Sequence, residues 1–151
     1  VNYTICGALE FPDYAGELKT LADSLGVAQR IRLVQIPYGD FASLRELYNE
    51  CDIYLLLSQT QPDGDTEGFG ISILEANACG TPAVGANQCG TAEAVQDGKG
   101  GRLITPQSTS ELLHAVKEIV QHYEFYSLGA HTRAAQFTNE KMARSFEALF
   151  Y

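Results

Sequence analysis

The sequence has few basic side chains and lacks the common short fingerprints of nucleotide sites. Ten Lys and Arg residues stand against nineteen Asp and Glu, which gives a formal net charge of -9 at pH 7. This charge disfavours nonspecific binding to nucleic acid or anionic lipid, because both are polyanions. We therefore expect no nucleic-acid partner. Neither G-x-G-x-x-G nor G-x-x-x-x-G-K-[ST] occurs, so the usual fingerprints of dinucleotide-binding and triphosphate-binding sites are absent.

Long apolar runs and paired cysteines are also missing. No run of 18 apolar residues occurs, so the sequence encodes no transmembrane helix. The opening VNYTICGALEF lacks the charged region of a secretory signal. The four cysteines form no C-x-x-C pair and have no zinc-like spacing. We therefore expect reduced cysteines, no metal site and a cytoplasmic protein, whose full-length form is compatible with a peripheral place at a membrane.

The sequence does contain an alternation of strand-like and helix-like segments, in 151 residues that are 45% hydrophobic. Strands are predicted at 2–6, 31–36, 52–58 and 82–86, and DGKGGRLI (97–104) is predicted to form a turn and then a strand. Helices are predicted at 13–25, 41–50, 70–79 and 91–96, and in three segments from 110 onward. The continuous apolar run at 52–58 is typical of a central parallel strand. This order predicts one α/β domain: a Rossmann-like parallel sheet with helices on both faces and a helical C-terminus.

Two loops of this predicted fold are candidates for a ligand site. In parallel α/β sheets, ligands bind beyond the carboxyl ends of the strands, and the loops at 58–68 and 87–91 lie at that edge. Gly68-Phe69-Gly70 precedes a helix, so its backbone N–H groups lie at the positive end of the helix dipole. Such groups suit phosphate, although glycine-rich turns of this kind also occur as packing solutions.

Glu67 and Glu75 lie on either side of this helix start. Glu75 falls in an apolar stretch, and its helix neighbours Ile71 and Cys79 argue against ordinary exposure. Carboxylates accept hydrogen bonds strongly, so the pair suits a ligand with an anionic centre and hydroxyls at both ends, such as a nucleotide-sugar. The structural alternatives are that Glu67 complements the helix dipole and that Glu75 pairs with a buried arginine or faces solvent.

The segment EGFGISILEANACGTPAV (67–84) resembles the retaining nucleotide-sugar glycosyltransferases of the GT-B class. More narrowly, it resembles the "glycosyl transferases group 1" family (glycosyltransferase family 4), which has two glutamates in the same pair of motifs. LRELYNECDIYLLLS and CGTAEAVQDGKGGRLITP resemble flanking segments of that family in the same order. The resemblance covers nearly the whole chain and implies one half of a GT-B fold, the C-terminal domain that binds the nucleotide-sugar donor.

The resemblance implies a role for each matching position. Glu67 would contact the sugar hydroxyls and is the candidate catalytic residue. The implied donor-binding residues are Gly68, Phe69, Gly70, Ile71, Glu75, Cys89, Gly90, Thr91, Pro37 and Tyr38. The amides of the first four would meet sugar and diphosphate, Glu75 would hold the ribose, the Cys89 loop would approach the distal phosphate, and the Pro37 turn would lie by the nucleobase. Such enzymes usually need no metal ion, because protein groups stabilise the leaving diphosphate, so no cofactor is expected.

The sequence departs from the family in three respects. Cys89 stands where the family normally has glycine, and the second strand runs into IPYGD where members more often have a glycine before the loop. The family's basic Arg–Lys pair and its N-terminal acceptor domain are missing. We therefore expect a piece of a longer enzyme, also lacking the first part of this domain, that is inactive alone and binds donors with millimolar or weaker affinity. The donor sugar, the nucleobase and the acceptor (a sugar or a lipid-linked glycan) are not specified.

Two other interpretations stay open at this point. One is a GT-B-like domain that has lost catalysis and serves in binding or regulation. The other is an unrelated flavodoxin-like or receiver domain, which predicts an acidic cluster or a flavin loop that the sequence does not clearly show. The histidines fall on C-terminal helices and are not expected to be catalytic. Phe146, Phe150 and Tyr151 are expected in the last helix, as an interface or as core.

Overall fold

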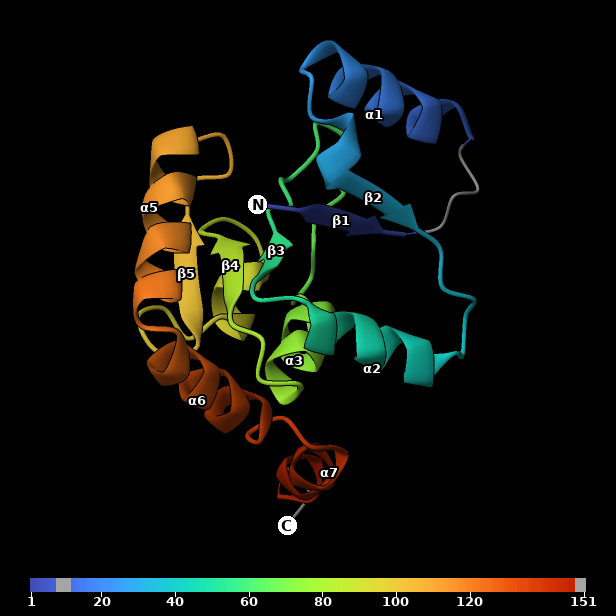
Figure 1. The fold of residues 1–151 in the computed structure, drawn as a ribbon. Helices are drawn as coiled ribbons and strands as arrows, with labels where there is room; N and C mark the ends of the chain where they lie inside the picture. The colour runs from blue at the N-terminus through green and yellow to red at the C-terminus, as the bar shows by residue number, and fades with distance from the viewer. Residues whose placement is uncertain (8–11, 149–151) are drawn as a thin grey trace. The chain divides into compact units, whose positions relative to one another are not determined.

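The computed structural model describes residues 1–7 and 12–148 (Figure 1). The expectations for Phe146, Phe150 and Tyr151 lie outside the described residues and side chains. The chain divides into two compact units, Val1–Leu44 and Arg45–Tyr151. Each unit has its own parallel sheet, so the five strands form two sheets instead of the single sheet expected. The predicted class, a Rossmann-like α/β fold with parallel strands, is confirmed.

The first unit pairs two strands through a helical crossover. Strands β1 (Tyr3–Cys6) and β2 (Ile31–Val34) run parallel, and α1 (Pro12–Ser24) and the short η1 (Ala28–Arg30) connect them. The unit ends in the first residues of α2 (Phe41–Glu50). Asp40 caps that helix, because its carboxylate accepts hydrogen bonds from the Ser43 N–H (3.1 Å) and hydroxyl (2.7 Å). These hydrogen bonds lower the pKa of Asp40.

The second unit contains three parallel strands in the order β3-β4-β5: β3 (Tyr54–Leu56), β4 (Ala83–Ala86) and β5 (Gly101–Ile104). Every residue of β4 is buried. The prediction of a central strand at 52–58 is wrong for this sheet, because β3 lies at one edge and β4 is in the centre.

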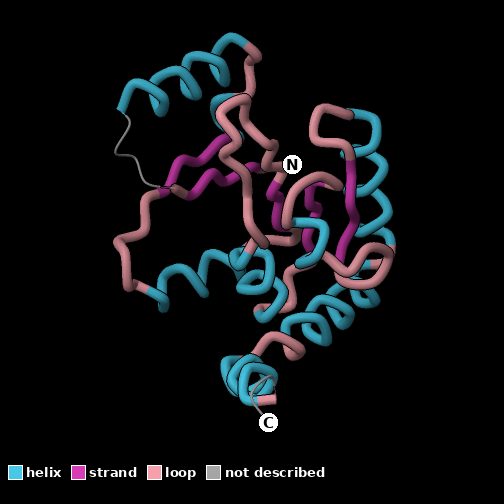
Figure 2. The backbone as a smooth tube through the Cα atoms, turned by 180° about the vertical axis from the view of Figure 1, so that it is seen from behind, coloured by secondary structure: helices cyan, strands magenta, loops and turns pink. Residues whose placement is uncertain are grey.

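Helices cover both faces of this sheet, which explains the apolar run around β3. On one face, α5 (Thr109–Gln121) and α6 (Tyr123–Ala134) pack on a core that also contacts Leu55 and Leu57. On the other, α3 (Ile71–Ala78) and α4 (Thr91–Ala94) pack on a core that contacts Tyr54 and Leu56. Alternate side chains of a strand point to opposite faces, so the run reflects two covered faces and not a central position. Figures 1 and 2 show these helices around the sheet, followed by α7 (Asn139–Glu147).

The outer edge of β5 is covered by acidic side chains. The Leu103 N–H donates to Asp97 Oδ1 (2.9 Å), and the Thr105 N–H donates to Glu111 Oε2 (2.8 Å). The hydrogen bond from Thr105 is the main cause that lowers the pKa of Glu111. These carboxylates take up main-chain donors that an edge strand would otherwise offer to another chain.

A second polar cluster joins α5, α6 and β5. The Tyr126 hydroxyl donates to Glu118 Oε1 at 2.6 Å, and Arg102 Nη1 lies 3.4 Å from the same oxygen. The hydrogen bond from Tyr126 is the main cause that lowers the pKa of Glu118, with Arg102 acting in the same direction.

Among residues 1–7 and 12–148, no helix is both long enough and apolar enough to cross a membrane.

Candidate functional site

The loops that follow β3 and β4 meet main chain to main chain. The Gly90 N–H donates to the Glu67 carbonyl oxygen at 2.9 Å. A Cβ atom at Gly90 would collide with the Gly68 carbonyl and lie 2.5 Å from the Phe69 nitrogen. Only glycine permits so close an approach. The structure therefore brings together the two loops that the sequence analysis singled out separately.

The Glu67 carboxylate lies at the start of α3. Its Oε1 accepts hydrogen bonds from the Gly70 N–H (2.9 Å) and the Phe69 N–H (3.3 Å). These are two of the amides that the resemblance assigns to sugar and diphosphate. The contact matches the structural alternative, an acid that complements the helix dipole. It also shows that this turn binds an anionic oxygen through two main-chain donors.

Gly70 sets the direction in which α3 leaves this turn. Its φ is 88°, in the left-handed region that favours glycine, and a Cβ there would lie 3.0 Å from Ile73 Cδ1. The next residue, Ile71, begins the helix with a side chain that is 68% exposed.

Glu75 is exposed, which corrects the expectation that its helix neighbours would keep it from solvent. The physical reason is the orientation of α3. This helix buries Ile73, Ala76 and Asn77 against the rest of the unit, whereas Glu75 and its neighbour at i-4 lie on the outer side. The placement matches the alternative of an exposed carboxylate.

Tyr48 of α2 orients Glu75, a contact that was not predicted from the sequence. Its hydroxyl donates to Glu75 Oε2 at 3.0 Å. Tyr48 itself is only 8% exposed, its ring packs edge-on against Tyr54 (5.7 Å between centroids), and its carbonyl accepts a hydrogen bond from the Thr81 hydroxyl (2.8 Å). The sequence did show a tyrosine on the inner face of the helix before β3. Its partner could not be predicted, because Glu75 lies 27 positions further along the chain.

Cys89 has an uncommon backbone conformation. Among residues 1–7 and 12–148 it is the one non-glycine residue with a positive φ, at 59°. A side chain in this region costs roughly 1–2 kcal/mol, which explains physically why glycine suits this position. The thiol sulfur lies 3.6 Å from the Ser58 carbonyl and 3.6 Å from the Thr91 hydroxyl.

Thr91 holds the same loop from inside. Its side chain is fully buried, and its hydroxyl donates to the carbonyls of Ala86 (2.7 Å) and Gln88 (3.1 Å). The Thr91 hydroxyl is therefore engaged inside the loop and is not presented to a ligand.

A polar depression of about 330 Å³ lies beside Glu67. It is lined by Ser58, Gln59, Gln61, Asp65, Thr66 and Glu67. Hydroxyl, amide and carboxylate groups are all able to hydrogen-bond the hydroxyls of a sugar.

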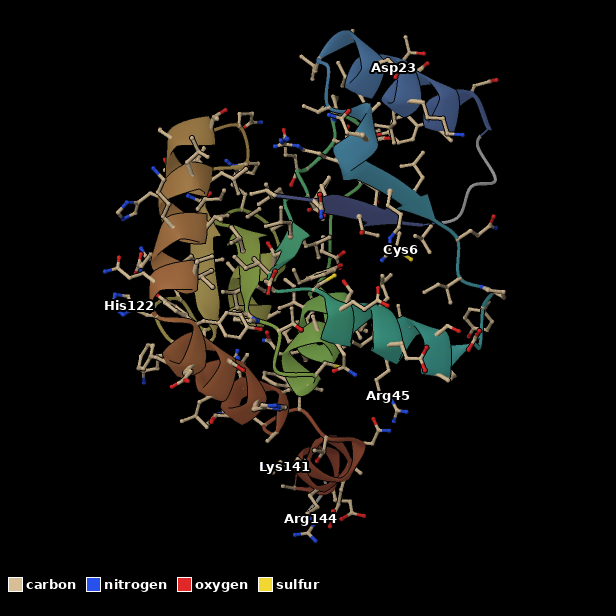
Figure 3. All side chains as sticks on the ribbon, in the orientation of Figure 1. Cys6, Asp23, Arg45, His122, Lys141 and Arg144 are labelled. Carbon is tan, nitrogen blue, oxygen red and sulfur yellow. The ribbon has the colours of Figure 1, made fainter. Side chains whose placement is uncertain are left out.

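Other candidate residues lie elsewhere. Pro37 and Tyr38 belong to the first unit, where Tyr38 is fully exposed, so their place beside a nucleobase stays a prediction. The three histidines are exposed; His114 lies on α5, His131 on α6, and His122 between the two helices (Figure 3). Within residues 1–7 and 12–148, no group of three or more His, Cys, Asp or Glu side chains is arranged to hold a metal ion.

Comparison with known proteins gives concordant matches. A D-inositol 3-phosphate glycosyltransferase of Geodermatophilus obscurus is 32% identical over 134 residues, which cover 89% of this chain and 28% of that protein. An N-acetyl-alpha-D-glucosaminyl L-malate synthase of Bacillus anthracis is 30% identical over 117 residues, 75% of this chain and 29% of that protein. The chain thus spans less than a third of the length of these relatives.

Solved structures agree with this similarity. Anabaena HepE in complex with UDP superposes with a TM-score of 0.77 and 26% identity, over 98% of this chain and 41% of that one. The same protein in complex with UDP-glucose gives the same TM-score. The model of the family described as "Glycosyl transferases group 1" matches residues 1–132. The chain therefore belongs to the glycosyl transferases group 1 family.

Proposed function

We propose that this chain is the donor-binding domain of a retaining glycosyltransferase, which moves a hexose from a nucleoside-diphosphate sugar to an acceptor hydroxyl. The observation that carries the proposal is the start of α3, where the Phe69 and Gly70 amides already hold an anionic oxygen beside the polar depression. The structures of Anabaena HepE with UDP and with UDP-glucose support this choice of donor class.

The geometry suggests how the two ends of such a donor would be held. Cleavage of the bond between sugar and diphosphate leaves negative charge on the diphosphate, and preorganised amides at a helix start stabilise such charge. For this, Glu67 would turn from the amides toward the sugar hydroxyls of the donor. Glu75, held by Tyr48, would accept the ribose hydroxyls. In this scheme protein groups stabilise the leaving group, and we propose that no metal ion is required.

The remaining parts of the reaction belong to the whole protein. Because the chain spans less than a third of its relatives, we propose that the acceptor site and the basic groups that complete diphosphate binding lie outside these 151 residues. The isolated chain would then be inactive and bind donors only at millimolar concentration or weaker. The cytoplasm, where sugar nucleotides are available, is the proposed location.

The test uses the full-length protein with Glu67→Ala and Glu75→Ala, and Glu124→Ala on the exposed side of α6 as the control. Turnover is followed with UDP- and GDP-linked hexoses, and the anomeric configuration of the product is read by NMR. We expect both site variants to lose turnover, the control to keep it, and the product to retain the donor configuration. Near-normal turnover by both folded site variants would contradict the site assignment. Binding of a donor without any turnover would instead indicate a non-catalytic module.

A further inference from the structure

The end of α6 reaches the turn that carries the candidate site. The ring of Phe137, three residues after α6, lies 5.4 Å from the ring of Phe69, at an angle of 53° between the planes. Phe69 stands between two glycines, so its ring is the one side chain that the Gly68–Gly70 turn offers to a partner. Contact with Phe137 therefore restrains the peptide groups on both sides of Phe69.

Arg133, in the last turn of α6, fixes Phe137 and at the same time holds α4. Its guanidinium lies 4.5 Å from the centroid of the Phe137 ring. Its Nε donates to the Ala94 carbonyl at 3.2 Å, and its Nη2 donates to the Glu93 carbonyl. A cation is favourable there, because the carbonyls at the end of a helix carry partial negative charge.

These contacts form a closed circuit, which runs from the Gly90 loop through α4, Arg133 and Phe137 to the Phe69 turn and back. The Gly90 N–H, at the start of α4, donates to the Glu67 carbonyl, and Arg133 donates to the carbonyls at the other end of that helix. Phe137 then links Arg133 back to Phe69. Arg133 and Phe137 thus connect the two site loops. Both residues lie beyond residues 1–132, which the family model matches.

We propose that Arg133 and Phe137 are positioning residues that set the distance between the Phe69 turn and the Gly90 loop. This inference rests on the proposed function. Both loops are assigned to the sugar and diphosphate, whereas the ribose is assigned to Glu75 and Tyr48, which lie outside the circuit. Loosening the circuit therefore weakens the contribution of the distal phosphate and leaves the nucleoside contribution unchanged.

The experiment measures, in the full-length protein, the ratio of affinities for a nucleoside diphosphate and its monophosphate (UDP against UMP, GDP against GMP) by titration calorimetry. Phe137→Leu keeps an apolar side chain but removes the ring, and Arg133→Lys keeps the charge but removes the planar fork. We expect each to lower the diphosphate-to-monophosphate ratio roughly two- to tenfold, the range expected for one aromatic or cation–π contact. Phe137→Tyr keeps the ring and should restore the ratio.

Two matched variants serve as controls. Phe125→Leu removes another aromatic pair of α6, with Tyr126 (5.5 Å), whose ring belongs to the core shared with α5. Arg144→Lys alters an exposed arginine of α7 that pairs with Glu140. We expect both to keep the wild-type ratio, whatever small change they cause in thermal unfolding.

A ratio unchanged in folded Phe137→Leu and Arg133→Lys would overturn the inference, and so would an equal loss of affinity for both nucleotides. If either variant fails to fold, Phe69→Leu breaks the same contact from the loop side and is subject to the same criterion. Failure of the proposed function is separate: the wild type would bind no nucleoside diphosphate, or the Glu67 and Glu75 variants would keep turnover.

Discussion

The two glutamates of the site are held in different ways. Glu67 is half-buried and accepts hydrogen bonds from main-chain amides two and three positions away. Glu75 is exposed and accepts a hydrogen bond from a tyrosine 27 positions away. Glu67 is therefore placed by the local conformation of a turn, and Glu75 by the packing of α2 beside α3. The first depends on glycines and the second on a single hydroxyl, so they should fail under different mutations.

The largest effect is expected from Gly90→Ala, which disrupts the Glu67 side of the comparison. The added Cβ would collide with the Gly68 carbonyl, and a main-chain neighbour cannot yield as a flexible side chain does. We expect a loss of about 3 kcal/mol in the free energy of unfolding, measured with denaturant, and loss of donor turnover.

Gly68→Ala is the matched control for stability, because a Cβ at Gly68 meets nothing within 4 Å. It should change the free energy of unfolding by less than about 0.5 kcal/mol. Equal stability of the Gly90 and Gly68 variants would show that the two loops are not in contact.

The next effect in size comes from Glu67→Ala, compared with Glu67→Gln. Removing the carboxylate leaves the Phe69 and Gly70 amides without this acceptor, which should cost about 1 kcal/mol of unfolding free energy. Glutamine keeps an acceptor oxygen and should recover part of that stability, while turnover stays low if the charge is needed at the sugar. Chemical denaturation and donor turnover measure the two effects; identical stability of both variants would contradict the capping role.

A smaller effect is expected from Tyr48→Phe, which alters the Glu75 side alone. The buried ring is retained and one hydroxyl is lost, so the free energy of unfolding should fall by about 0.5 kcal/mol. The donor KM should rise severalfold with little change in kcat, because a less well oriented Glu75 holds the ribose less firmly. Nucleotides that lack the ribose hydroxyls should be bound equally by wild type and variant.

Tyr126→Phe is the control for that variant, because Tyr126 donates to Glu118 in a second tyrosine–glutamate pair. It should lose stability without changing the donor KM. An equal rise of KM in both tyrosine variants would mean that general destabilisation, and not the orientation of Glu75, is responsible.

The smallest effect is a dependence of stability on pH that comes from Glu118. The Tyr126 hydroxyl lowers the pKa of Glu118 in the folded protein, so folding favours the ionised carboxylate. Its stabilising contribution is complete above the pKa of the unfolded chain and is lost as the pH falls through the lower, folded pKa. Glu118→Gln should flatten the acidic limb of a plot of melting temperature against pH. An unchanged acidic limb would contradict this assignment.

Sequence reasoning found the elements and the site loops because both depend on local patterns. The turn at Gly68–Gly70 and the neighbouring loop at Cys89–Thr91 were predicted from glycine spacing and from a family resemblance. The capping of α2 by Asp40 was not predicted, and the exposure of Glu75 stood only among the alternatives. A helical pattern shows which side chains share a face, but it does not show which face packs inward.

Other features depended on contacts between distant segments. The edge position of β3 could not be predicted, because an apolar run indicates covered faces and is silent about neighbouring strands. Tyr48, Arg133 and Phe137 act through partners that lie far away in the sequence. The positive φ of Cys89 was foreshadowed only by the glycine that the family has at this position.

The carboxylates along the outer edge of β5 also bear on how the protein behaves in concentrated solution. Asp97 and Glu111 occupy main-chain donors, and Glu111 places negative charge where a strand of a second molecule would have to align. A second copy approaching this edge meets repulsion before it can pair. Acidification that protonates Glu111 removes part of that repulsion, so self-association should begin at this edge in acid. At neutral pH we therefore expect the carboxylates of this edge to oppose pairing with a second copy.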